Sequence, residues 1–132
     1  MDFLLTIHSI LRWVILLVGV VAVVKFALGW LRGGPFGGLD RGLTAGFSGL
    51  MDLQGALGLV LLVWGGLAGD GFPLYRILHA AVMILAIGAS HQLMRWKTAP
   101  DRLRYRNSAL ITLGALVLVF VGIAILRLKP AG

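Results

Sequence analysis

Two histidines stand at matching positions in two apolar stretches of this 132-residue chain. His8 lies five residues into a stretch that begins at Phe3, and His79 lies five residues into one that begins at Leu74. An ionisable side chain inside a membrane-crossing helix is costly to bury, so it marks a candidate functional site. Imidazole is a common ligand of metals and of haem iron. The chemistry that these residues suggest is ligation of one cofactor between two rings.

An arginine accompanies each histidine at helical spacing. Arg12 follows His8 by one turn, and Arg76 precedes His79 by one turn. The guanidinium group pairs with carboxylates in a bidentate geometry. We therefore expect both arginines to lie near the carboxylates of the bound group, which in a haem are the two propionates.

Four apolar runs must position these residues, at about residues 3–30, 47–67, 74–94 and 108–128. A helix needs ~20 apolar residues to cross the ~30 Å hydrocarbon core of a bilayer. The runs predict one domain, residues 1–132, that is all-α: an integral-membrane four-helix bundle with up-down-up-down topology. Its first and third helices then run parallel on a diagonal of about 11–14 Å. That spacing suits a flat tetrapyrrole such as haem, ligated from both faces by imidazole.

Composition agrees with a membrane protein. The chain is 59% hydrophobic and 13% charged, with a mean hydropathy of +0.96. A soluble domain of this size needs many more solvated residues. There are no cysteines, which excludes iron–sulfur ligation, thioether attachment of haem and thiol catalysis.

The formal charge of +7 is unevenly distributed. Eight cations fall on one predicted side (Lys25, Arg32, Arg41 and the five between residues 95 and 106) and four on the other (Arg12, Arg76, Arg127 and Lys129). The positive-inside rule places both basic connections in the cytoplasm and both termini outside, in a bacterial inner membrane. Acidic lipid headgroups are the expected partners of the basic connection at residues 95–106. Nucleic acid is not expected, because so short a loop offers no recognition fold.

The first connection, residues 32–42, is rich in glycine. It carries no Walker pattern, and no strand precedes it, so a nucleotide site is not indicated. We expect a flexible loop.

Other polar residues leave alternatives open. In a second register of the first helix, His8 rests among the headgroups, about 10 Å above His79. His91 is expected to be solvated near Arg95, and Asp52 to face the basic loop from a helix N-terminus. Gln54 is expected to bond across the bundle, or to form a quinone or proton site with His91. A metal held by all three histidines is disfavoured by the distance of His91 from the others.

Three short segments carry a resemblance. The run from His8 to Trp13, the run from Gln54 to Gly58, and His79 early in the third helix resemble small bacterial four-span proteins described as cytochrome-b-like. The resemblance implies a b-type haem and electron transfer, with His8 and His79 as the ligands. The chain lacks the two stacked histidine pairs of larger cytochromes b, so it does not indicate a relay through two haems.

Three functions therefore compete. The first is an electron carrier with one haem near the outer face, whose partners are membrane redox subunits or quinone. The second is a non-enzymatic accessory subunit that stabilises a larger membrane complex. A small-molecule or ion carrier is a third, which the unbroken apolar spans disfavour.

Overall fold

The computed structural model describes residues 2–129, which form an all-helical structure with four long helices. They are α1 (Asp2–Arg32), α2 (Gly38–Gly65), α3 (Leu74–His91) and α4 (Asp101–Leu126). A π-helical turn, η1 (Gly66–Asp70), extends α2, and a 3₁₀ turn, η2 (Gln92–Trp96), extends α3. By length and composition, all four helices can cross a membrane. The all-α, four-helix part of the prediction is confirmed.

Glycine and proline determine where the helices stop and start. After α1, Gly33 and Gly34 have φ angles of 77° and 100°, which side-chain-bearing residues rarely adopt. Pro73 and Pro100 immediately precede α3 and α4. The ring of a proline fixes φ. Proline also has no backbone N–H, so at the start of a helix, where N–H groups lack partners, it leaves one unsatisfied donor fewer.

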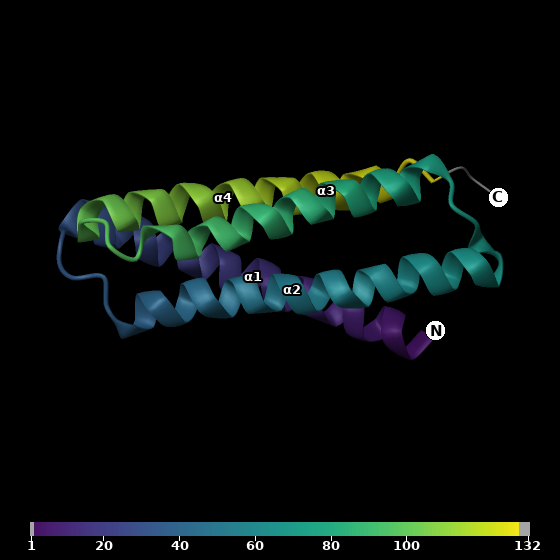
Figure 1. The fold of residues 1–132 in the computed structure, drawn as a ribbon, viewed down its shortest axis with the longest axis horizontal. Coiled ribbons are helices and arrows are strands. Elements are labelled where there is room, and N and C mark those ends of the chain that lie inside the picture. Colours follow the sequence, from purple (N-terminus) through teal and green to yellow (C-terminus); the bar gives the residue numbers. More distant parts are fainter. Residues whose placement is uncertain (1, 130–132) are drawn as a thin grey trace.

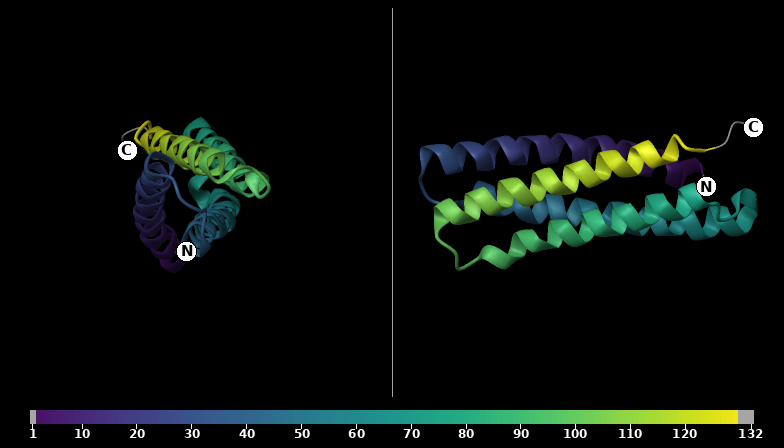
Figure 2. Two further views of the ribbon diagram at one scale, coloured as in Figure 1. Left: turned by 90° about the vertical axis from the view of Figure 1, so that its left-hand side faces the viewer. Right: turned by 90° about the horizontal axis from the view of Figure 1, so that it is seen from above.

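The helices pack in a ring, in which α1 contacts α2 and α4, and α3 contacts the same two helices. Thus α1 and α3 occupy one diagonal, and α2 and α4 occupy the other (Figure 2). Figure 1 shows the connections at residues 33–37 and 97–100 together on the left, which we call the basic end. The turn at residues 71–73, the start of α1 and the end of α4 lie together on the right, which we call the histidine end.

The interior contains two clusters of buried apolar side chains. The larger one runs through the middle of the bundle: Ile15, Leu16, Phe47, Met51, Ala86, Leu93, Ala115, Leu116 and Val119. The smaller one lies at the basic end: Ala22, Phe26, Phe36 and Tyr105. Most other large apolar side chains are exposed on the outside, as on a surface that faces lipid.

Two helices begin earlier than the apolar runs indicated. α2 begins at Gly38 rather than near residue 47, and α4 at Asp101 rather than near residue 108. The additional turns are amphipathic: Asp40 and Thr44 are buried while Arg41 is exposed. A search for continuous apolar sequence misses such turns, because polar groups there bond inside the bundle.

Candidate functional site

His79 is held by the backbone of α4. Its Nδ1 lies 2.7 Å from the carbonyl oxygen of Gly122. A carbonyl only accepts hydrogen bonds, so Nδ1 carries a proton, and in the neutral ring the lone pair is on Nε2. Metal-ligating histidines use this arrangement, in which a carbonyl orients the ring and fixes the tautomer.

His8 packs against α2 at the same end of the bundle. A Cβ atom on Gly58 would lie 3.3 Å from His8 Cε1, so the ring rests where α2 has no side chain. The amide of Gln54 donates to the backbone carbonyl of His8 at 2.8 Å and ties α1 to α2 there. The prediction that Gln54 bonds across the bundle is confirmed.

These contacts define a layer of four residues, one from each helix: His8, Gly58, His79 and Gly122. We call it the histidine layer. The two imidazoles are on the α1–α3 diagonal and the two glycines on the α2–α4 diagonal. His8 lies against Gly58 of α2 and His79 lies against Gly122 of α4.

Several polar atoms around the layer lack partners. His8 Nδ1, Gln54 Oε1 and Arg12 Nε are buried and make no hydrogen bond within residues 2–129. Each such atom costs about 1–3 kcal/mol if it stays unsatisfied. All three are on α1 and α2, within about one helical turn of His8 or Gly58 along the chain.

The two arginines differ in their surroundings. Arg12 lies over the ring of Trp13, 5.0 Å from its centroid, with Nε unpartnered. Arg76 donates to the carbonyl of Gly71 at 2.6 Å and to that of Leu61 at 3.1 Å. Arg76 therefore ties α3 to the end of α2, and of the two only Arg12 keeps a buried donor without a partner near the histidines.

One side chain already fills part of the histidine layer, so a cofactor could bind there only if that side chain moved. The methyl group of Met83 occupies the position that a Cβ on Gly122 would take. Methionine is unbranched and adopts many rotamers, so this side chain can move aside. Within residues 2–129, no three His, Asp or Glu side chains cluster closely enough to hold a metal ion by themselves.

Asp52 and His91 form a hydrogen-bonded pair on the outside of the bundle. His91 Nε2 lies 2.6 Å from Asp52 Oδ1, and the side chains are 51% and 46% exposed respectively. Asp52 does not sit at a helix N-terminus as expected, because α2 begins at Gly38 and places Asp52 near its middle. Gln54 and His91 bond to different partners.

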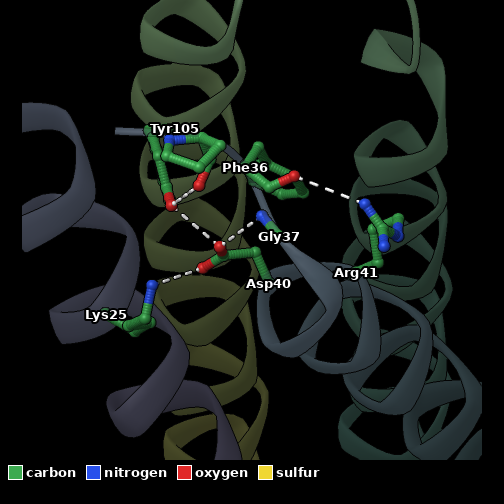
Figure 3. A network of polar contacts seen from close by, with 7 residues as sticks. Lys25, Phe36, Gly37, Asp40, Arg41 and Tyr105 are labelled. Carbon is green, nitrogen blue, oxygen red and sulfur yellow. Dashed lines mark hydrogen bonds and ion pairs between the residues drawn. The ribbon is translucent and has the colours of Figure 1, made fainter. Parts of the chain in front are cut away.

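A second polar site lies at the basic end, where the buried carboxylate of Asp40 binds three groups (Figure 3). Lys25 donates to Oδ1 at 2.7 Å, and the backbone N–H of Gly37 donates to Oδ2 at 2.9 Å. The Tyr105 hydroxyl lies 2.8 Å from Oδ2 and 2.7 Å from the carbonyl of Pro35, and its single proton can go to either acceptor. We call this network the Asp40 clamp; it joins α1, α2 and α4.

The first connection is shorter than the glycine-rich run at residues 32–42, because α2 begins at Gly38, and one of its side chains is packed in the bundle. Phe36 is only 5% exposed. Its ring stacks on Phe26 with centroids 5.9 Å apart and tilts against Tyr105 at 5.0 Å. Arg104 covers it, 4.1 Å from the ring centroid. Because the segment is rich in glycine, its sequence did not indicate that Phe36 would be buried and would hold the segment against the bundle.

Gly29 makes room for the clamp, which leads to a prediction. A Cβ there would overlap the Tyr105 ring, and that ring cannot shift without breaking its hydrogen bonds. We expect Gly29→Ala to lower the free energy of unfolding in mixed micelles by about 2 kcal/mol through overpacking. Gly114→Ala, at an open position on α4, should leave it nearly unchanged; equal effects of the two substitutions would contradict this explanation.

Comparisons with family models, with curated proteins and with solved structures find no match to this chain. The fold therefore indicates only a broad class of protein: its four apolar helices are suited to a multi-pass membrane protein.

Proposed function

We propose that this chain is an up-down-up-down membrane bundle that binds one b-type haem between His8 and His79 and carries electrons. The observation that supports it best is the histidine layer: two imidazoles on one diagonal and two glycines on the other. On that second diagonal, Gly58 and Gly122 add no side chain of their own, and the His8 ring and the movable Met83 side chain lie against them.

The residues of the chain have distinct roles in this proposal. His79 offers Nε2 to the iron because the Gly122 carbonyl holds its other nitrogen. His8 offers the second imidazole from α1, which Gln54 holds by the backbone. Arg12 is the donor for a propionate, since its Nε is buried without a partner. We assign Arg76 to the turn between α2 and α3 instead, because both of its terminal nitrogens bind carbonyls there.

A bound haem supplies reversible one-electron chemistry. The chain would tune its potential through the imidazoles of His8 and His79, the nearby charge of Arg12, and exclusion of water by the surrounding apolar side chains. We propose a bacterial inner membrane as the location, with the basic end in the cytoplasm. Acidic lipid headgroups would bind the basic end, and the electron partners would be other membrane redox subunits or a quinone.

An absorption spectrum tests the proposal directly. Protein purified from haem-replete cells should show sharp reduced-minus-oxidised bands. His8→Ala and His79→Ala should each abolish these bands, and His91→Ala, on the outside of the bundle, should keep them. Circular dichroism and gel filtration of the variants establish that the bundle is still folded. A colourless wild-type protein, or bands that persist in folded His79→Ala protein, would refute haem ligation by this pair.

The alternative is an accessory subunit without a cofactor, which stabilises a larger membrane complex. The exposed Asp52–His91 pair favours it, because a partner chain can cover such a pair. That function predicts stable co-purification with other chains and no effect of removing His8 or His79.

A further inference from the structure

The Asp52–His91 pair lies at the depth of the hydrocarbon core. α4 carries no charge from residue 107 to residue 126, about 30 Å of helix. His79 meets α4 at Gly122, and His91 is twelve residues, or roughly 18 Å, further along α3. Because α4 runs back along α3, the pair lies level with about residue 110, inside the uncharged stretch.

Lipid cannot satisfy the groups that this pair exposes. The contact between Nε2 and Oδ1 uses one atom of each side chain, which leaves His91 Nδ1 and Asp52 Oδ2 for a second partner. Both side chains are about half exposed. Charged groups at this depth usually face a bundle interior or another polar group.

The surface beside the pair permits a close approach. Gly49 precedes Asp52 by one turn, and Gly88 precedes His91 by one turn. Both glycines are exposed, and a Cβ on either would meet nothing within 4 Å. Gly42 and Gly46 continue this open face of α2, and with Gly49 they lie within an arc of roughly 60°. Helices in membranes associate closely where small residues let the backbones meet.

We propose that this face of α2 and α3 binds a second copy of the chain about a two-fold axis. A two-fold interface brings the same surface of both copies together. It places Asp52 of each copy opposite His91 of the other, so a His91 ring that carries a proton on both nitrogens donates from Nε2 to its own Asp52 and from Nδ1 to Asp52 Oδ2 of the other copy. Each copy thus supplies the polar partner that the other exposes, without any further polar residue. A helix from an unrelated protein would have to supply its own donor and acceptor at this depth.

This proposal depends on the proposed membrane insertion and not on haem. The absence of cysteine makes the test direct. Ala45→Cys, on the exposed face of α2, is expressed in membranes and oxidised; Val117→Cys, exposed on α4, is the matched control. Ala45→Cys should give a disulfide-linked homodimer, and Val117→Cys should not. Equal cross-linking of the two, or cross-linking of Ala45→Cys only to other proteins, would overturn the proposal.

A second substitution tests whether the two copies pack through the face of α2 that carries Gly42, Gly46 and Gly49. Gly49→Leu added to Ala45→Cys should reduce the dimer roughly tenfold, whereas Gly114→Leu, at an open position on α4, should not change it. An unchanged dimer with Gly49→Leu would contradict packing through this face. Alkaline extraction of the same membranes separates the two proposals: a chain released from the membrane refutes insertion, and a retained chain without cross-links refutes only the dimer.

Discussion

Asp40→Ala should lower the free energy of unfolding by about 3 kcal/mol. Removing one member of a buried ion pair leaves the other charge uncompensated, which costs about 3–5 kcal/mol. The value should fall at the low end, because the Lys25 side chain is 34% exposed while that of Asp40 is 3% exposed. The substitution also removes the acceptor for the Gly37 N–H and one acceptor for the Tyr105 hydroxyl.

The measurement is unfolding in mixed detergent micelles, followed by circular dichroism. Asp101→Ala is the matched control, because this exposed acid begins α4 and should change stability by less than about 0.5 kcal/mol. Asp40→Ala should also make the segment at residues 33–37 more sensitive to protease, since the Gly37 contact holds it. Equal stability of the two variants would mean that the clamp contributes nothing.

Gly58→Leu should reduce haem binding by roughly tenfold or more while His8 and His79 remain in place. A leucine there projects against the His8 ring and would move it from the position that we propose for ligation. Overpacking of this kind costs about 1–3 kcal/mol, and 1.4 kcal/mol corresponds to a tenfold change in affinity.

The readout is haem content per folded protein, with Gly114→Leu as the control at an open position on α4. Comparing the haem content of these two variants tests the packing around the site while both histidines are kept, which the histidine substitutions cannot do. Full haem content in Gly58→Leu protein would contradict a haem site at the histidine layer.

The sequence predicts the parts of the fold that depend on local pattern. The four apolar runs indicate four helices, and the equal offsets of His8 and His79 indicate one depth if α1 and α3 run parallel. The starts of α2 and α4 are missed because their first turns mix buried and exposed polar residues. The partner of Asp52 is missed for the same reason: the true start of α2 decides which side chains it faces.

The Asp40 clamp could not be predicted in the same way. Asp40 and Tyr105 are 65 positions apart, and the contact depends on how α2 and α4 rotate about their axes. A signal was present, since Lys25 is one of two cations in the first apolar run and an acidic partner was to be expected for it. Gly58 and Gly122 could not be chosen from the chain's 19 glycines, because only the packing shows which of them adjoin a histidine.

The clamp also imposes an order on biosynthesis. Lys25, Gly37 and Asp40 all belong to the first hairpin, so they can meet as soon as α1 and α2 have left the ribosome. Tyr105 follows Asp40 by 65 residues, a delay of about 3–13 s at ~5–20 residues per second. During that interval the carboxylate has two of its three donors, and the groove at Gly29 lacks the phenol ring that fills it. Arrival of α4 therefore completes the first hairpin, so its assembly depends on the last helix to be synthesised.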